Sequence, residues 1–378
     1  MNIAIVCYPT FGGSGVVATE LGIALNHRGH QVHFVTYKQP VRLDALNAKL
    51  RFHEVFVPDY PLFRYLPYEL ALSSRLVDVV KTYAIDVLHV HYAIPHAYAA
   101  YMTKKILQDE GVIVPIVTTL HGTDITLVGS HPFYKPAVAF SINHSDCVTA
   151  VSESLKNETY DYFEIQKEIK VIPNFIDIGK YRNKPIPCER DLLVAAEEKI
   201  VTHISNFRPV KRILDVIKVF ERIQKEVSAK LMMIGDGPEM KKAKQYVKGA
   251  KLEDQVLFLG KSNEIDKILC YTDVFLLLSE QESFGLSALE AMVNRVPVIS
   301  TNVGGLPEVN VDGFSGYLHP VGAVDAMAAS ALRLLKNPTL LTQFKQQAFE
   351  TACRYDLKNV VALYEQEYQD AVDRANDH

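Results

Sequence analysis

Residues 274–290 read VFLLLSEQESFGLSALE, an apolar run followed by a polar loop and the start of a helix. The run Val274 to Leu278 predicts a buried strand, because it is short, continuously apolar and bounded by polar residues. The same strand–helix alternation occupies nearly the whole chain, which predicts parallel sheets covered by helices on both faces. The other expected strands are 2–8, 31–37, 87–91, 113–120, 148–151, 200–205, 230–234, 256–259 and 296–300, with helices such as 16–28 and 212–226 between them.

A break near Pro173-Asn174, which continues through residues 180–187, separates two α/β blocks of similar size. We expect one Rossmann-like domain at 1–175, completed by a C-terminal helix within 357–378, and a second at 176–356. Ligands of open α/β sheets bind beyond the carboxyl ends of the strands. Two such domains that face each other would form a cleft with one substrate on each side.

The composition excludes several classes of protein. Of 378 residues, 48% are hydrophobic and 22% are charged, which excludes wholesale disorder. The formal net charge of −4 argues against a general nucleic-acid binder. The longest stretch free of acidic and basic residues, 87–103, is too short for a membrane span, and the N-terminus lacks the cationic region of a signal peptide. We expect a cytoplasmic protein without a membrane span, and the sequence leaves a homo-oligomer open.

The cysteines and histidines do not predict a metal site. The five cysteines stand at 7, 147, 188, 270 and 353 without a C-x-x-C pair, which is typical of free thiols in a reducing compartment. His89 and His91 share one strand face, but no third ligand is evident. No Asp-x-Asp occurs, so a metal clamp on a nucleotide diphosphate is not indicated. We expect neither a metal nor a cofactor.

The loop and helix within 274–290 carry candidate binding groups. Glu282 and Glu290 are spaced E-x7-E, so one carboxylate lies in the loop and the other two turns into the helix. Carboxylates accept hydrogen bonds from sugar hydroxyls. The backbone N–H groups of Ser283, Phe284 and Gly285 would stand at a helix N-terminus, where a phosphate binds well. The spacing alone is a weak signal, and the strand–loop–helix context strengthens it.

A glycine-rich loop, FGGSGVVA, follows the first expected strand. Gly13, Gly15 and Ala18 fit G-x-G-x-x-G/A, in which glycines let the backbone approach a diphosphate at a helix N-terminus. A dinucleotide fold also needs an acidic residue at the end of its second strand, yet residues 21–43 contain none and Lys38 stands at that place. NAD is therefore disfavoured, and an NADP-dependent oxidoreductase or a simple tight turn are the alternatives.

Two more motifs follow expected strands. The stretch LHGTD at 120–124 brings His121 to the end of a strand, although a structural histidine is an equal alternative there. Arg208, Lys211 and Arg212 place three cations within five residues at a strand–helix junction. They suit a phosphate, because Lys and Arg can neutralise a leaving diphosphate. The alternative is a solvated basic helix start, but cations there oppose the helix dipole.

In this order the motifs resemble the retaining glycosyltransferases of family GT4. These have the GT-B fold, in which two Rossmann-like domains with parallel sheets face each other across a cleft. The resemblance covers essentially the whole chain and includes GDGPE at 235–239 and GGLPE at 304–308. The more specific stretches that carry it are 7–9, 12–15, 89–96, 118–126 and 205–208. The resemblance implies an N-terminal acceptor-binding domain and a C-terminal nucleotide-sugar-binding domain.

The implied reaction is transfer of N-acetylglucosamine from UDP-N-acetylglucosamine (UDP-GlcNAc) to the hydroxyl of L-malate, with retention at the anomeric carbon, in bacillithiol synthesis. A related enzyme with another small anionic acceptor is the nearest alternative. A non-catalytic two-lobed sugar-binding protein is disfavoured by the cationic loop. No carboxylate in the motifs is an obvious covalent nucleophile. We therefore hypothesise same-face attack, in which the leaving phosphate takes the malate proton.

The resemblance assigns residues to the donor. The implied catalytic residues are His121, Lys211, Arg208 and Glu282. The implied donor-binding residues are Gly13, Asn206, Gly260, Lys261, Ser283, Phe284, Gly285 and Glu290. In these sets Glu290 would hold the ribose hydroxyls, Glu282 the sugar hydroxyls, and Lys211 the charge that develops on UDP. His121 would contact the donor sugar near the reacting carbon.

The remaining implied contacts are those of the diphosphate, the uracil and the acceptor. Gly13 would approach the diphosphate, and the backbone at 260–261 would meet the uracil. Ser14, Tyr92 and Thr119 would contact malate.

The chain departs from the family pattern at one place. Many family members have Gly-Arg where this chain has Ser205-Asn206. Because Asn206 cannot supply charge, Arg208 would share the phosphate role with Lys211.

Overall fold

The computed structural model describes residues 1–10, 12–43, 47–59, 61, 63–182, 190, 197–262 and 264–377. Phe11 of the glycine-rich loop, positions 183–187 of the expected linker, Cys188 and His378 lie outside the described residues. The chain divides into two compact units. Unit 1 comprises Met1–Asn174 and Leu357–His378, and unit 2 comprises Phe175–Asp356.

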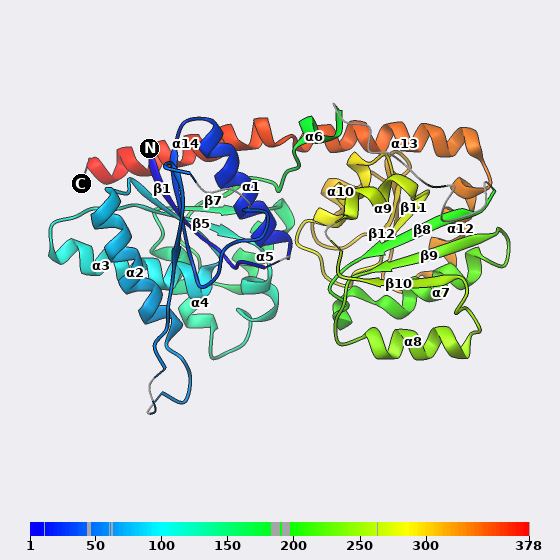
Figure 1. The fold of residues 1–378 in the computed structure, drawn as a ribbon, viewed down its shortest axis with the longest axis horizontal. Coiled ribbons are helices and arrows are strands. Elements are labelled where there is room, and N and C mark those ends of the chain that lie inside the picture. The colour runs from blue at the N-terminus through cyan, green and yellow to red at the C-terminus, as the bar shows by residue number, and fades with distance from the viewer. Residues whose placement is uncertain are drawn as a thin grey trace. The chain divides into compact units, whose positions relative to one another are not determined.

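Unit 1 contains a parallel sheet of seven strands in the order β3-β2-β1-β4-β5-β6-β7. The strands are β1 (Asn2–Val6), β2 (Gln31–Thr36), β3 (Leu50–Glu54), β4 (Val87–His91), β5 (Ile116–Leu120), β6 (Cys147–Ala150) and β7 (Ile169–Val171). Its helices are α1 (Gly13–His27), α2 (Tyr68–Tyr83), α3 (Tyr98–Asp109), α4 (Lys135–Asn143), α5 (Glu153–Tyr162), α14 (Leu357–Asn376) and the short η1 (Ala93–Ala97) and η2 (Thr123–Leu127). The C-terminal helix α14 packs against α1, β4 and β5 (Figure 1).

Unit 2 contains a parallel sheet of six strands in the order β10-β9-β8-β11-β12-β13. The strands are β8 (Lys199–Ile204), β9 (Ala229–Ile234), β10 (Val256–Gly260), β11 (Val274–Leu277), β12 (Val298–Thr301) and β13 (Gly316–His319). Its helices are α6 (Ile178–Arg182), α7 (Ile213–Ile223), α8 (Met240–Gly249), α9 (Ile265–Tyr271), α10 (Leu286–Val293), α11 (Leu306–Val309), α12 (Val324–Leu335), α13 (Pro338–Ala352) and the short η4 (Pro209–Lys211) and η5 (Cys353–Tyr355). The expected pair of Rossmann-like α/β units with parallel sheets is confirmed.

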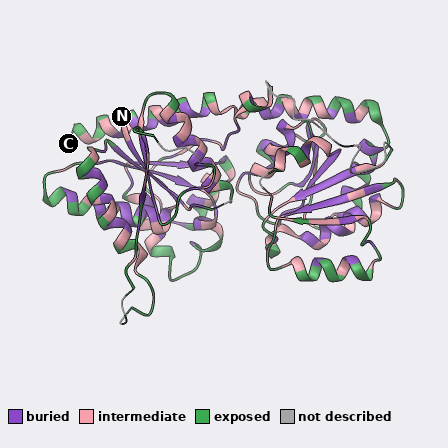
Figure 2. Cartoon of the chain, in the orientation of Figure 1, coloured by how far each residue is buried: buried purple, intermediate pink, exposed green. Residues whose placement is uncertain are grey.

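The strands form the buried centre of each unit, as Figure 2 shows. In unit 2, helix α7 buries one face that includes Val216, Phe220 and Ile223 against the sheet. Each such side chain contributes about 1.5–3 kcal/mol when it leaves water. The buried faces of the helices and strands determine the position of each strand in its sheet. That position determines which loops lie next to one another at the carboxyl ends of the strands. No described helix is both long and apolar enough to cross a membrane.

Several element boundaries differ from the expected ones. Helix α1 begins at Gly13 rather than at residue 16, so that Gly13 is its first helical residue. Strand β5 begins at Ile116, after Pro115, rather than at 113. Helix α7 begins at Ile213, because Arg212 has a left-handed backbone with φ of 49°. The sequence did not predict β3, β7 or β13, and each of these lies at the edge of its sheet.

Candidate functional site

The strand order reverses at one position in each sheet. In unit 1 the chain runs from β1 outward to β3 and returns to β4 on the other side of β1. In unit 2 the same reversal separates β8 from β11. At such a switch point the loops after the two central strands diverge, and this opening is where α/β sheets bind ligands.

At the switch point of unit 1, Ser14 and Tyr92 meet. Ser14 lies in the first turn of α1, and Tyr92 directly follows β4. The Ser14 Oγ and Tyr92 hydroxyl oxygen atoms are 2.6 Å apart and share a hydrogen bond. The turn of α1 comes close to the end of β1 because Gly15 has no side chain: a Cβ atom there would lie 2.5 Å from the backbone oxygens of Tyr8 and Thr10.

His121 lies beside Tyr92, directly after β5. The two rings are 5.1 Å apart between centroids. His121 Nε2 lies 2.8 Å from Nδ1 of His91, at the end of β4. Burial, with a smaller effect of His96, lowers the pKa of His121 to about 3, so its ring is neutral near pH 7. The structure thus brings together Ser14, Tyr92 and His121.

The loop after His121 is held by Asp124, which the sequence did not single out as a functional residue. Its carboxylate accepts hydrogen bonds from the backbone N–H groups of Ala93, at 2.8 Å, and Gly122, at 3.1 Å. Burial nevertheless raises the pKa of Asp124 to about 6. Asp124 therefore ties the loop after β5 to the loop after β4, and only its place in LHGTD could have signalled this.

Thr119 lies apart from these groups, below the surface. It is fully buried, and its hydroxyl is 2.8 Å from both His89 Nε2 and Thr149 Oγ1. Its backbone oxygen accepts a hydrogen bond from the N–H of Tyr92 at 2.9 Å. The structure does not place the Thr119 hydroxyl where a ligand could reach it, so the residue supports Tyr92 from beneath.

At the switch point of unit 2, Lys211 and Glu282 meet. Lys211 ends the short helix η4 after β8, and Glu282 lies in the loop after β11. Lys211 Nζ lies 2.5 Å from Glu282 Oε2, and the Ser279 hydroxyl donates to the same oxygen at 3.1 Å. The two charged side chains are 18% and 16% exposed, so both remain within reach of a ligand. The sequence predicted separate roles for these residues and did not predict their ion pair.

The other two cations of this loop differ in their contacts. Arg212 is paired with Asp215, with Nη2 and Oδ2 2.6 Å apart. Arg208 is exposed and has no ion-pair partner among the described residues. Asn206 is exposed beside it, on the same loop. Of the two cations that the sequence assigned to a phosphate, Lys211 is therefore held in place and Arg208 is not.

The glycines of GDGPE bring the loop after β9 against the loop after β8. A Cβ atom on Gly235 would lie 1.7 Å from the backbone oxygen of Ser205, and one on Gly237 would lie 2.1 Å from that of Asn206. Gly260 extends this arrangement, because its backbone oxygen accepts from the N–H of Gly235 at 2.8 Å. Gly260 and the exposed Lys261 belong to edge strand β10 and the position after it, two strands away from β8.

The GGLPE segment supports the loop that contains Glu282. The N–H of Gly305 donates to the backbone oxygen of Glu282 at 2.9 Å. A Cβ atom on Gly304 would lie 2.0 Å from that same oxygen, and Gly304 has φ of 55°. The segment that the sequence left as either a lining or a turn thus packs directly beneath the predicted site.

The remaining predicted residues follow along the same loop and helix. Phe284 is buried, with its ring 5.5 Å from that of Tyr355, and Gly285 has φ of 99° just before α10. No described residue accepts a hydrogen bond from the backbone N–H of Phe284 or Gly285. Glu290 lies in α10, partly exposed, and its backbone oxygen accepts from Asn294 at 2.9 Å. Two N–H groups just before α10 therefore have no acceptor among the described residues.

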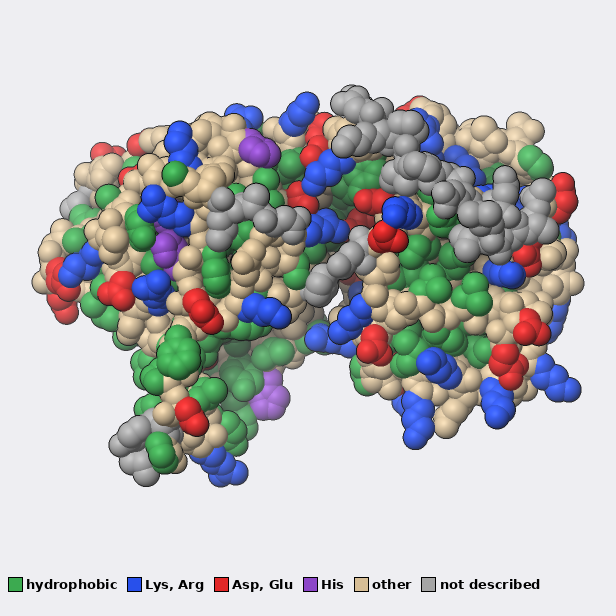
Figure 3. Space-filling view, viewed as in Figure 1, with side chains coloured by type: hydrophobic (Ala, Val, Ile, Leu, Met, Phe, Trp, Pro, Cys, Tyr) green, Lys and Arg blue, Asp and Glu red, His purple; other side chains and the backbone are tan. Residues whose placement is uncertain are grey.

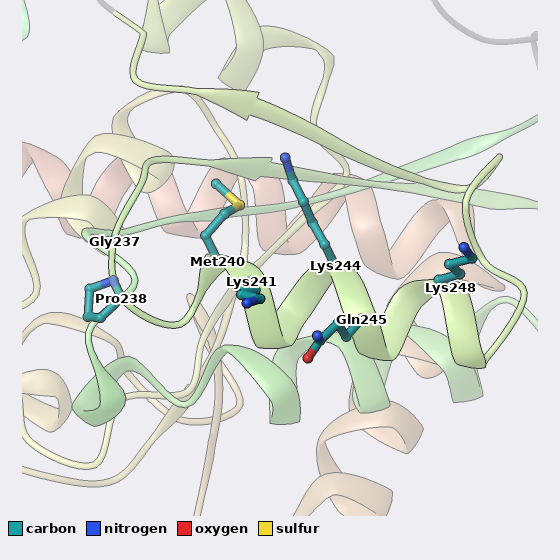
Figure 4. A pocket seen from close by; sticks show the side chains of 7 residues that line it. All are labelled: Gly237, Pro238, Met240, Lys241, Lys244, Gln245 and Lys248. Atoms are coloured by element: carbon teal, nitrogen blue, oxygen red, sulfur yellow. The ribbon is translucent and has the colours of Figure 1, made fainter.

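Two other features lie outside these switch points. A hollow of about 580 Å³ borders α8 and is lined by Gly237, Pro238, Met240, Lys241, Lys244, Gln245 and Lys248 (Figure 4). Figure 3 shows hydrophobic side chains gathered on the segment that projects from unit 1 between β3 and α2, where Phe56, Tyr65 and Leu66 are exposed. In the part of the chain that the structure describes, no three His, Cys, Asp or Glu side chains are grouped so that they could hold a metal ion.

Two family models match this chain, one in each half. The family described as Glycosyltransferase Family 4 matches residues 11–180, and that described as Glycosyl transferases group 1 matches residues 189–351. N-acetyl-alpha-D-glucosaminyl L-malate synthase of Bacillus anthracis is 46% identical over 98% of this chain and 97% of that protein. Alpha-monoglucosyldiacylglycerol synthase of Streptococcus pneumoniae is 24% identical over 88% of this chain and 77% of that protein.

Solved structures share the fold at lower identity. Anabaena Alr3699/HepE, in complex with UDP and glucose, matches with a TM-score of 0.83 at 19% identity, over 98% of this chain and 99% of that one. Sucrose-phosphate synthase from Thermosynechococcus elongatus matches with a TM-score of 0.80 at 20% identity, over 98% of each chain. At these identities the likeness establishes the fold alone.

Proposed function

Because this chain belongs to the GT4 glycosyltransferases and is itself a glycosyltransferase, we propose that it moves N-acetylglucosamine from UDP-GlcNAc to the hydroxyl of L-malate with retention. The product would be the N-acetylglucosaminyl malate of bacillithiol synthesis. The 46% identical relative carries this specific assignment, since its name states both the transferred sugar and the acceptor. The same comparisons favour a glycosyltransferase over an NADP-dependent oxidoreductase.

On the donor side, the proposal is supported by the Lys211–Glu282 pair at the switch point of unit 2. A nucleotide sugar presents a diphosphate beside sugar hydroxyls, which is the complement of a cation beside a carboxylate. In our proposal the Lys211 ammonium leaves the Glu282 carboxylate and pairs with the diphosphate. Sugar hydroxyls then donate hydrogen bonds to Glu282. The unused N–H groups of Phe284 and Gly285 would donate to a phosphate or sugar oxygen, and Glu290 would hold the ribose hydroxyls.

The remaining donor contacts belong to the same proposal. Gly13 would approach the diphosphate from the N-terminus of α1, and the backbone at 260–261 would meet the uracil. Arg208 would move onto the diphosphate from its exposed position, because Asn206 beside it is uncharged. Each of these contacts fits a group that the structure leaves accessible.

On the acceptor side, the proposal involves unit 1. The hydroxyls of Ser14 and Tyr92 already share a hydrogen bond at 2.6 Å. They can donate to the carboxylates of malate, and they can donate to or accept from its hydroxyl. Thr119 would act indirectly, because its buried hydroxyl bonds to His89 and Thr149 and its backbone oxygen holds Tyr92.

The chemical step would depend mainly on stabilising the charge of the leaving group. As the bond between the anomeric carbon and the phosphate oxygen breaks, negative charge grows on UDP, where Lys211 would neutralise it. The malate hydroxyl attacks the same face, and its proton passes to the departing phosphate oxygen. His121 would contact the donor sugar near the reacting carbon. We propose that this reaction needs neither a metal ion nor a cofactor.

The test is release of UDP from UDP-GlcNAc with a panel of acceptors. We expect L-malate to stimulate release far above the rate with water, and the product to carry an α-linked sugar. Stereoisomeric D-malate and succinate, which lacks the hydroxyl, are the matched controls. If another acceptor stimulates release and L-malate does not, the malate assignment is wrong and the glycosyltransferase class stands. If EDTA abolishes release, the proposal of a metal-free reaction is wrong.

A further inference from the structure

Three histidines are linked by close contacts near the carboxyl ends of β4 and β5. His91 Nδ1 is 2.8 Å from His121 Nε2, and the two rings stack with centroids 5.0 Å apart. His96 Nδ1 is 2.5 Å from the backbone oxygen of His91. His91 and His96 are fully buried, whereas His121 is partly exposed. The proposed reaction so far gives a role to His121 alone.

All three rings are neutral near pH 7. Burial is the main cause: it lowers the pKa of His121 to about 3, that of His96 to about 4, and that of His91 well below its ordinary value. A neutral imidazole carries one proton, on one of its two nitrogens. Because a carbonyl oxygen can only accept, the proton of His96 must be on Nδ1. The remaining question is which nitrogen donates between His91 and His121.

The surroundings of His91 answer this question. If His121 donated from Nε2, His91 would have to carry its own proton on Nε2. That atom is buried and has no hydrogen-bond partner among the described residues. A buried N–H group without an acceptor is rarer in proteins than an acceptor without a donor. His91 therefore carries its proton on Nδ1 and donates it to Nε2 of His121.

We propose that His91 is a positioning residue that fixes the tautomer of His121, so that His121 offers an Nδ1–H donor to the bound substrate. No described residue occupies Nδ1 of His121, and the residue is partly exposed, so Nδ1 is the nitrogen available to a ligand. A further consequence rests on the proposed function. With its proton already on Nδ1, His121 donates to an oxygen of the donor sugar and is not the base that takes the malate proton.

The tautomer can be measured without any substrate, by nitrogen-15 NMR of the histidine rings at pH 7. We expect His121 to show a protonated Nδ1 and a bare Nε2, with its signals assigned by their loss in His121→Gln. His91→Asn, whose amide can replace the Nδ1–H donor, should leave this pattern unchanged. His91→Phe keeps a ring but no donor, so the Nδ1–H form of His121 loses this hydrogen bond and the Nε2–H form should become detectable beside it. A wild-type His121 with its proton on Nε2 would overturn the proposal, whatever the acceptor specificity proves to be.

The activity of the same variants tests whether the tautomer matters for turnover. We expect His91→Phe to lower kcat/KM on the order of tenfold, which corresponds to about one neutral hydrogen bond. His91→Asn should retain nearly the wild-type value. Thermal unfolding of both variants identifies any general loss of folding. Equal losses of activity in the two folded variants would show that His91 does not act through the tautomer of His121.

Discussion

Lys211 has one preferred position, because it pairs with the carboxylate of Glu282, which Ser279 holds in place. Lys211 Nζ lies 2.5 Å from Glu282 Oε2, and Ser279 donates to that same oxygen at 3.1 Å. A long lysine side chain normally loses conformational freedom when it binds an anion. Here part of that cost is met before any ligand arrives, so the ammonium is preorganised for a phosphate.

Replacing Lys211 by Ala should therefore remove most of the activity and leave the fold intact. We expect kcat/KM for UDP release to fall about 10²–10³-fold, as when one stabilising contact to a developing charge is lost. The two side chains are only 18% and 16% exposed, and Glu282 keeps Ser279 as a partner, so the loss should lower stability by about 1–3 kcal/mol. The matched control is Lys218→Ala, which removes a lysine paired with Asp215 at 3.6 Å on the outer part of α7. Near-normal turnover in Lys211→Ala would remove its proposed role.

At the residue scale, motifs predicted which side chains gather but not how they bond. Lys211 and Glu282 were both predicted from patterns after strands, because a local pattern reports the type of residue at a strand's end. Their ion pair joins loops 71 residues apart, and no local pattern encodes such a partner. Thr119 shows a second limit of prediction from sequence. Its place next to LHGTD suggested a contact with the ligand, but nothing in the sequence indicated that its hydroxyl is directed into the core.

Among the elements, the loop that contains Glu282 depends on its neighbour. Gly304 and Gly305 lie against the backbone of residues 282–283, closer than any side chain would permit. Gly304 also has φ of 55°, a conformation that L residues other than glycine adopt at a cost. The GGLPE segment is thus a support for the candidate donor site, and its glycines are required by close approach.

A comparison of Gly304→Ala with Gly313→Ala separates the effect of the close contact between Gly304 and Glu282 from the effect of backbone strain. Both glycines have positive φ, of 55° and 70°, so both substitutions introduce a similar backbone strain of about 1 kcal/mol. Only at Gly304 would the new Cβ meet another atom, the Glu282 oxygen at 2.0 Å, whereas nothing lies within 4 Å at Gly313. We expect Gly304→Ala to raise the KM for UDP-GlcNAc at least several-fold more than Gly313→Ala does. Equal effects would mean that the contact does not shape the site.

The elements also show which parts of the fold a sequence pattern reveals. The central strands were predicted to within a few residues, because burial on both faces makes them continuous apolar runs. The three strands that were missed are edge strands with mixed composition, such as Leu50-Arg51-Phe52-His53-Glu54 in β3. An edge strand is partly exposed, so its residues need not be apolar, and its pairing is decided by the neighbouring strand.

Helix α14 is attached to unit 1 through a buried polar contact. The Tyr368 hydroxyl lies 2.7 Å from His89 Nδ1, and His89 Nε2 lies 2.8 Å from Thr119 Oγ1. In Tyr368→Phe, His89 Nδ1 would remain buried without this partner, at a cost of about 1–3 kcal/mol. We expect a lower midpoint of urea unfolding at pH 7. Tyr65→Phe removes the same hydroxyl from a ring that is 79% exposed and should leave the midpoint unchanged. A shift of equal size in both variants would contradict this account.

At the scale of the whole molecule, the two units repeat one plan with different chemistry. Each sheet reverses its strand order once, and each reversal has a polar contact across it: Ser14 with Tyr92 in unit 1, and Lys211 with Glu282 in unit 2. The neutral hydroxyls and the ion pair explain why the net charge of −4 gave no indication of the sites. A count over the whole chain averages out a few local cations.

The units also differ in their buried histidines. Burial lowers the pKa of six described histidines in unit 1: to about 3 for His89 and His121, to about 4 for His33, His53 and His96, and well below the ordinary value for His91. In unit 2 it lowers the pKa of His203 to about 4 and that of His319 to a lesser degree. Unit 1 therefore contains most of the buried histidines that take up a proton only when acid unfolds their surroundings.

Acid should consequently loosen unit 1 before unit 2. Between about pH 6.5 and 4 the histidines bind protons in the unfolded chain but stay neutral in the folded protein. The free energy of unfolding therefore falls as the pH falls. Each buried histidine contributes about 1.4 kcal/mol per pH unit in this window. Asp124 and Glu158, whose pKa values burial raises, act in the opposite direction, but they are two groups against six histidines. Hydrogen exchange at pH 7 and pH 5, corrected for intrinsic rates, should show protection lost in β4 and β5 and retained in β8 and β11. Equal loss in both sheets, or none in either, would contradict the prediction.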